Sequence, residues 1–308
     1  MKAKQLPVIL CGLVAGLLAV IAPQSAFAGG LHIHPVFKGG NPPPPQSIHG
    51  GGNLQAIFAV AAKNWERIFR QGPDSWDITI EFEWAPTMEN GVTYAQEIFE
   101  DEGGTPIRPT RSLVRFRNTE TPNGEFDWYA DPHPERNAAA GDYEHYESVV
   151  AEVFDEDANP IGEINIGRIL STETGPAAGR VDLLSVAMHE IGHALGLDSA
   201  YAGRIQQITG KTLDIKPPLP FAGMFIFISG GNHIDLFHFL ALMTSEPHPG
   251  WRNLISSLDA LVIAQLTSWE QPDLSEPPGL PRVEELHCCR LVLGPPATQT
   301  PPVPDLVQ

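Results

Sequence analysis

The chain has 308 residues, a formal net charge of −18 at pH 7 and only three cysteines. The acidic balance argues against nucleic-acid binding, because carboxylates repel phosphate backbones. The small number of cysteines excludes a disulfide-rich fold, and two of them, Cys288 and Cys289, are adjacent, a spacing that would strain a bond between them.

The first residues have the organisation of an export signal. Lys2 and Lys4 precede an apolar run over residues 8–22, and Ala26 and Ala28 are small residues at the positions that a signal peptidase reads. The run is shorter than a bilayer span of ~20 residues. We therefore expect a signal peptide over residues 1–28 and no stable membrane insertion after its removal. The mature protein would be secreted, with a periplasmic or cell-surface location as the alternatives, and loss of two lysines takes its charge from −18 to about −20.

Several strands and one helix are predicted before residue 170. Residues 31–37 alternate apolar and polar and predict a first strand with His32 and His34 on its outer face. A metal cluster of these two with His49 is an alternative, but we favour ordinary polar positions on an exposed face. The periodicity also predicts an amphipathic helix at residues 54–69 and strands at residues 78–84, 113–116, 126–129 and 164–169.

The most informative segment is the H-E-I-G-H motif of residues 189–193, within a predicted helix that begins near the N-cap residue Asp182. Residues four apart share a helix face, so His189 and His193 can direct two imidazole nitrogens at one metal ion. Glu190 projects from nearly the same side. This is the H-E-x-x-H pattern of zinc peptidases, in which the glutamate is the general base. The flanking residues are apolar, and a buried helix needs partners for these polar groups.

A glycine soon ends this helix. Gly196 follows the second histidine by three residues, and glycine enters the left-handed conformation without steric cost. The pattern resembles that of the metzincin clan, H-E-x-x-H-x-x-G-x-x-H. Ser199 stands where the last ligand is expected, and a serine hydroxyl is a poor zinc ligand. The next local candidate is Asp198. Because a catalytic zinc site uses three protein ligands and a water molecule, a third ligand is still needed.

A better source of the third ligand lies at residues 230–243. Here the chain resembles the leishmanolysin family within the metzincins, in which an insertion displaces the third histidine and a Leu-Met pair follows. The resemblance implies that His233 is the third zinc ligand and that Met243 is the Met-turn residue beneath the zinc. His238 stays open as an alternative ligand, although we favour a polar residue within an apolar run. Residues 255–269 resemble the closing helix of the family, which ends near a tryptophan.

The same resemblance implies an α+β fold of the zincin or metzincin type. It would have a mixed twisted sheet, an early helix, the zinc-binding active-site helix and a smaller lower subdomain, over residues 29–271. In the family an edge strand of the sheet pairs with an extended peptide, and residues 164–169 are among the candidates for that strand. Prolines recur over residues 272–308 and apolar periodicity fades, which predicts a disordered or extended tail.

These features predict a secreted zinc metalloendopeptidase, a hydrolase with one catalytic Zn²⁺ and protein or peptide substrates. A zinc-activated water would attack the peptide bond, with Glu190 as general base. The alternative is a non-catalytic, zincin-like protein that binds zinc or a partner. Ser199 favours that alternative, whereas Glu190 argues against it, because a structural site does not need this carboxylate. Calcium has no support, since no 12-residue loop with ligands at alternating positions is visible.

Export should remove the first 28 residues and leave Gly29 at the N-terminus, because Ala26 and Ala28 form the cleavage signal. The intact mass of the exported protein measures this directly. A mass that retains Cys11 with a diacylglyceryl group would contradict the prediction and would indicate a lipoprotein.

Overall fold

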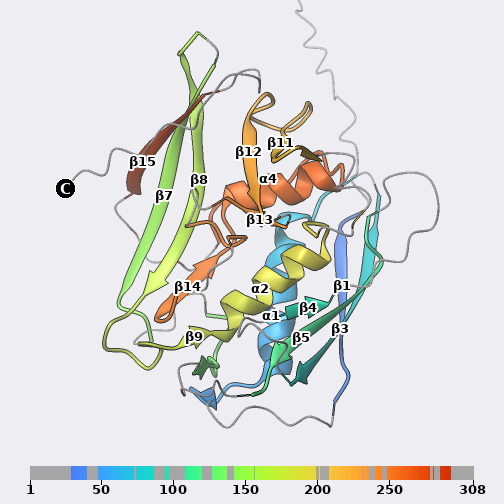
Figure 1. Cartoon of the computed structure of the whole chain (residues 1–308), viewed down its shortest axis with the longest axis vertical. Helices are drawn as coiled ribbons and strands as arrows, with labels where there is room; N and C mark the ends of the chain where they lie inside the picture. Colours follow the sequence, from blue (N-terminus) through green and yellow to red (C-terminus); the bar gives the residue numbers. More distant parts are fainter. Residues whose placement is uncertain are drawn as a thin grey trace, which may run out of the picture.

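The computed structural model describes residues 29–39, 48–72, 74–86, 94–96, 108–119, 127–136, 142–155, 157–198, 201, 208–230, 232–235, 240–244, 248–277, 280 and 285–292. Within these ranges the protein is mixed α+β, with three helices and several small sheets (Figure 1). The predicted signal peptide lies outside the described residues. None of the described helices has both the length and the apolar character needed to cross a membrane.

The first sheet is mixed and has the strand order β1-β3-β5-β4. Its strands are β1 (Leu31–Phe37), β3 (Trp76–Ala85), β5 (Arg111–Arg117) and β4 (Tyr94–Gln96). The first three run parallel, and β4 is antiparallel to β5 at the edge. The predicted alternation is confirmed in β3, where every second side chain is buried, and in β1, where His32 and His34 point outward.

Helix α1 (Leu54–Ile68) is the predicted amphipathic helix. The side chain of its N-cap, Asn53, accepts a hydrogen bond from the Ala56 N–H at 2.9 Å, which satisfies one of the free amides of the first turn. The predicted apolar stripe is confirmed, since each of its members is buried: Leu54, Ile57, Phe58, Ala61, Ala62, Trp65 and Phe69. Phe58 stacks on Phe82 of β3 with ring centroids 4.1 Å apart, which fastens the helix to the first sheet.

The second sheet contains the longest strands and has the order β14-β8-β7-β15. Its strands are β14 (Trp251–Leu254), β8 (Pro160–Ser171), β7 (His145–Phe154) and β15 (Glu285–Val292). The predicted strand at residues 164–169 lies within β8. It pairs with β7 along one side, whereas β14 pairs on the other side only with Arg168 to Ser171. Among the described strands, residues 164–167 therefore have β7 as their one partner, and their pairing with a peptide stays a prediction. The sequence analysis missed β7.

Described parts of the C-terminal segment pair with elements far away in the sequence. β15 pairs in parallel with β7. Further upstream, the Asp273 N–H donates to the Ile68 carbonyl at 2.7 Å, and its carboxylate pairs with Arg70 at 2.9 Å. The Leu274 carbonyl accepts a hydrogen bond from Arg168 of β8. β15 is extended, which is one of the two forms predicted for residues 272–308, and its pairing with β7 is what the sequence did not predict. Local composition carries no information about backbone pairing with distant strands.

Two smaller sheets complete the described strands. One is parallel, in the order β2 (Ile48–His49), β6 (Trp128–Tyr129) and β9 (Val181–Asp182). The other is antiparallel, in the order β10 (Ile208–Thr209), β11 (Thr212–Asp214), β12 (Phe225–Ser229) and β13 (His233–Ile234). The antiparallel sheet is formed by the chain that follows the H-E-I-G-H motif, and its last strand, β13, begins at His233.

Helix α2 (Leu183–Ala194) carries the motif through the middle of the molecule, between the first sheet and the long strands β7 and β8 (Figure 1). It packs against α1, β5 and β14. The Trp65 indole N–H donates to the Met188 carbonyl at 2.8 Å and so joins the two helices. The helix begins where the sequence predicts, with Asp182 as N-cap. Helix α4 (Ser257–Leu266) is the predicted closing helix, and Trp269 after it is buried.

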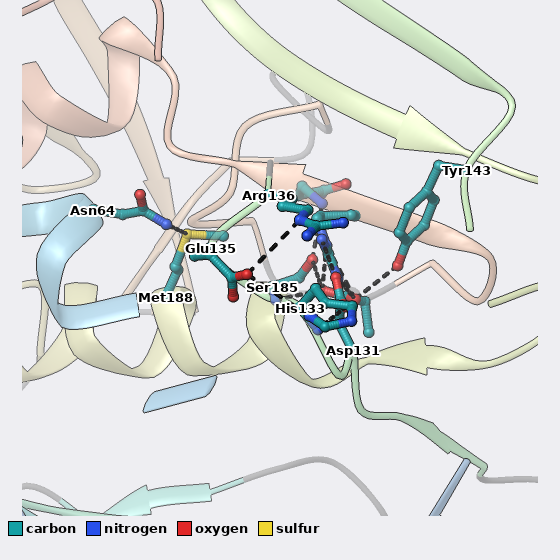
Figure 2. A network of polar contacts seen from close by, with 11 residues as sticks. Asn64, Asp131, His133, Glu135, Arg136, Tyr143, Ser185 and Met188 are labelled. Carbon is teal, nitrogen blue, oxygen red and sulfur yellow. Dashed lines mark hydrogen bonds and ion pairs between the residues drawn. The ribbon is translucent and has the colours of Figure 1, made fainter. Parts of the chain in front are cut away.

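A buried ion cluster anchors the start of α2. Arg252, on β14, is fully buried and pairs with Asp182 at 2.8 Å and with Asp131 at 2.9 Å. The Tyr143 hydroxyl donates to Asp182 at 2.7 Å, and the Ser185 N–H donates to the same carboxylate. Figure 2 shows Asp131, Tyr143 and Ser185 gathered around this point. The cluster joins β14 to the N-terminus of the helix that carries the motif.

Replacing Arg252 by methionine should lower the free energy of unfolding by ~3–5 kcal/mol, because Asp182 and Asp131 would stay buried without their cation. Urea denaturation measures the change. Arg111→Met is the matched control: it removes a 2.8 Å pair with Glu81 that is partly exposed, and its cost should stay within about 1 kcal/mol. Equal small losses in both variants would show that the cluster does not stabilise the fold.

Candidate metal centre

The three motif side chains emerge from the last turns of α2. Glu190 and His193 are buried, with 3 % and 5 % of their surface exposed, and His189 is half-buried. The spacing of four residues places the two imidazole rings on one face, with ring centroids 4.6 Å apart. Gly196 follows with φ of +129°, a conformation that glycine adopts without a steric penalty, so the helix ends where the sequence predicts.

The structure brings His233 to this pair. The chain leaves α2, forms the antiparallel β10–β13 sheet and returns at β13, where His233 pairs with Ser229 of β12. On its other side, the neighbouring Ile234 N–H donates to the Met243 carbonyl at 2.9 Å. The ring centroid of His233 lies 5.3 Å from that of His189 and 4.9 Å from that of His193. Backbone hydrogen bonds on both sides therefore fix the position of the third histidine.

These three histidines form a candidate ligand set. One ring nitrogen from each lies within 4.8 Å of the others. Across the described ranges, no other group of three or more histidine, cysteine, aspartate or glutamate side chains has its ligand atoms this close together. The alternative cluster of His32, His34 and His49 is thus not assembled; instead, His34 pairs with Asp77 at 3.2 Å.

Two backbone carbonyls set the tautomers of the helix histidines. His189 Nδ1 lies 2.8 Å from the Leu242 carbonyl oxygen, and His193 Nδ1 lies 2.8 Å from the Leu197 carbonyl oxygen. Because a carbonyl oxygen only accepts, both Nδ1 atoms must donate, which leaves the lone pair of a neutral ring on each Nε2. The two Nε2 atoms face each other at 3.0 Å. Two lone pairs at that distance repel, and a cation between them removes the repulsion.

Burial keeps the rings in the neutral form that binds metals. Desolvation lowers the pKa of His189 below its ordinary value of 6.5, although the bond to the Leu242 carbonyl acts in the opposite direction. Desolvation, reinforced by the neighbouring histidines, lowers the pKa of His193 well below 6.5. For His233, desolvation and then His189 lower the pKa to about 4. All three imidazoles are therefore unprotonated at neutral pH and can act as nitrogen ligands.

Met243 packs against Gly192, which lies between the two helix histidines in the sequence. It is fully buried, and a β-carbon added at Gly192 would stand 2.3 Å from its sulfur. Only a glycine at that point of α2 lets the thioether approach the helix backbone this closely. The sequence analysis used Gly192 only as a variable position of the motif. The need for glycine at position 192 is apparent only in the tertiary structure, where Met243, 51 positions away in the sequence, packs against it.

The turn that carries Met243 is held from two further elements. The backbone N–H groups of Leu242 and Met243 both donate to the carboxylate of Asp259 on α4, at 3.0 and 2.9 Å. From the other side, Leu240 lies against Gly167 of β8, where an added β-carbon would stand 2.5 Å from the Leu240 side chain. The sequence offers one signal for Asp259, the Ser-x-x-Asp spacing of a capping box with Ser256, but that signal does not connect it with residues 240–244.

Of the remaining candidates, the structure describes only Asp198, and it is not part of the cluster. Asp198 lies just beyond the end of α2, its backbone carbonyl accepts the Tyr201 N–H at 3.2 Å, and its carboxylate is absent from the group of converging ligand atoms. His238 and Ser199 lie outside the described residues. The geometry therefore brings together His189, His193 and His233, with Glu190 and Met243 on adjacent positions.

Comparisons of the chain with protein-family models, with curated proteins and with solved structures find no match. The interpretation of the site therefore depends on its own residues and their arrangement.

His233→Ala should lower zinc affinity by more than the ~10–100-fold typical of changes around a ligand, because it removes one of three converging nitrogens. His238→Ala and Asp198→Ala are the matched comparisons and should have smaller effects. Zinc titration against a competing chelator measures all three. If His233→Ala keeps the parental affinity while one of the others loses it, His233 is not the third ligand.

Proposed function

We propose that this protein is an exported zinc-dependent metalloendopeptidase, with His189, His193 and His233 as zinc ligands. The observation that carries the proposal is the pair of Nε2 atoms that face each other at 3.0 Å while both Nδ1 atoms are committed to carbonyls. A third imidazole nitrogen lies within 4.8 Å. Buried rings with facing lone pairs favour a bound cation, and imidazole nitrogen is a preferred ligand of zinc.

The donor set fits a catalytic zinc ion rather than a structural one. Structural zinc sites close with four protein ligands, whereas catalytic sites use three and keep one position open. Two nitrogens bound to one zinc at ~2.0–2.1 Å in tetrahedral geometry lie roughly 3.4 Å apart, so small rotations of these rings would accommodate the ion. When bound, zinc lowers the pKa of water toward ~7 and polarises a peptide carbonyl.

The protein side chains would then have separate roles. The three histidines would hold and orient the ion, and the Leu242 and Leu197 carbonyls would fix the rings of His189 and His193. Glu190, next to a ligand on the same helix, would take a proton from the attacking water and pass it to the leaving amine. Because Glu190 is 3 % exposed, bulk water has little access to this proton transfer.

A metzincin-like fold with a leishmanolysin-like layout is the finer proposal. The order of elements supports it: a mixed sheet, an early helix, the motif helix, an excursion that returns with His233, and then the turn with Met243. Within the described strands, β4 ends the first sheet, is antiparallel to β5 and lies near α2. We propose β4 as the edge that pairs with an extended peptide substrate, with residues 164–167 of β8 as the alternative.

A non-catalytic zinc-binding protein is the second candidate. Ser199 occupies the position of the usual last ligand of the extended motif, and this departure would be consistent with a degenerate site. The position of Glu190 argues against it, because a carboxylate next to a ligand is costly to bury unless it has a task. Loss of proteolysis with retention of zinc in one variant separates the two candidates.

Glu190→Gln should abolish proteolysis, with a drop of about 10²–10⁴-fold, while zinc content stays near one per chain, because Glu190 is a base and not a ligand. A casein or peptide-library digest measures activity, with a chelator control. Glu147→Gln on the exposed side of β7 is the matched carboxylate-to-amide control and should keep parental activity. Equal activity of Glu190→Gln and the parent protein would exclude the mechanism. An inactive parent that binds zinc would support the second candidate.

A further inference from the structure

Asp259 is a fully buried carboxylate at the start of α4 that contacts two parts of the chain. Within the helix start it accepts the Ser256 N–H at 2.8 Å and the Ser256 hydroxyl at 2.6 Å. Across the core it accepts the Leu242 and Met243 N–H groups at 3.0 and 2.9 Å. A capping box needs only the first pair of contacts. The second pair comes from the 242–243 turn, which is not part of the capping box at the start of α4.

These contacts continue to the candidate metal centre. The peptide unit on one side of Leu242 donates its N–H to Asp259, and the Leu242 carbonyl on the other side accepts the Nδ1–H of His189 at 2.8 Å. A carbonyl that accepts from Nδ1 determines which ring nitrogen carries the lone pair and in which plane the ring lies. The position of this carbonyl follows from the position of the turn, and Asp259 holds the turn by two consecutive amides.

We propose that Asp259 is a positioning residue for the metal centre: it holds the 242–243 turn so that the Leu242 carbonyl orients His189 toward the ion. This inference rests on the proposed function, because it assumes that His189 is a ligand. It adds that α4, which supplies no ligand, contributes to metal affinity through a buried carboxyl group. Because this group has two oxygens, it can accept both turn amides and keep its contacts with Ser256.

The substitution Asp259→Asn tests the proposal. The amide group keeps the size of the side chain but has one acceptor oxygen in place of two, so it cannot accept both turn amides and maintain the Ser256 contacts. Ser256→Ala is the matched control. It removes the hydroxyl that caps α4 and leaves both contacts between Asp259 and the turn. Both variants weaken the start of α4, and only the first releases the turn.

Two readouts that do not depend on catalysis separate these roles. Competition titration should show zinc affinity reduced by ~10–100-fold in Asp259→Asn and changed by less than about 2-fold in Ser256→Ala. The visible absorption spectrum of the cobalt(II)-loaded protein reports ligand geometry and should change in Asp259→Asn alone. If both variants bind metal as the parent does, or if both lose affinity equally, Asp259 is only a helix cap and the proposal is wrong.

A measurement on the unaltered protein covers the case in which Asp259→Asn does not fold. Because coupling between two sites is reciprocal, metal loading should slow hydrogen exchange of the Leu242 and Met243 amides more than that of the Ala56 amide, which is held by the Asn53 cap of α1. Equal slowing would overturn the inference. Failure of the proposed function has a different signature: a parent protein that takes up no zinc or cobalt excludes the metal centre itself, and this inference with it.

Discussion

The candidate metal centre depends on the position of the turn at residues 240–244. A ligand must be held within about 0.5 Å of its working position, yet an imidazole on a helix can still rotate about two bonds. The Leu242 carbonyl removes this freedom for His189, and the sulfur of Met243 fills the space against Gly192. The Asp259 carboxylate and a backbone hydrogen bond to β13 hold residues 240–244 in place.

Burial determines the protonation state of the three histidines as well as their positions. Removing the imidazoles from water lowers the pKa of His189, His193 and His233, so each ring keeps a lone pair at neutral pH. The same burial makes misplaced polar groups costly, and the protein meets this constraint with backbone carbonyls at the two Nδ1 atoms. At the opposite end of α2, Arg252 pairs with Asp182, which caps the helix, and with Asp131. The N-cap carboxylate and the two imidazole Nδ1 atoms of α2 thus all have partners within an apolar core.

Local patterns succeeded where the decisive interactions are local. The stripe of α1, the alternation of β3 and the N-cap at Asp182 follow from periods of 3.6 and 2 residues and from short-range hydrogen bonds, and the structure confirms each of them. They failed for two strands of the second sheet. β7 was missed although its partner β8 follows it directly, because burial along β7 does not alternate strictly. β15 joins the sheet from a proline-rich segment, and its pairing with β7 joins residues more than a hundred positions apart, which no short window of sequence contains.

The sequence by itself determined the motif pair. His189 and His193 stand four residues apart on one helix, so helical geometry alone brings their rings together, with Glu190 beside them. The position of His233 was not a local matter: tertiary structure places it beside the pair, whereas the Asp198 carboxylate is not among the converging ligand atoms. That placement required pairing of β12 with β13 and a hydrogen bond from Ile234 to Met243. The roles of Gly192, Gly167 and Asp259 were likewise decided only in three dimensions, because each depends on close packing against one turn that is distant from it in the sequence.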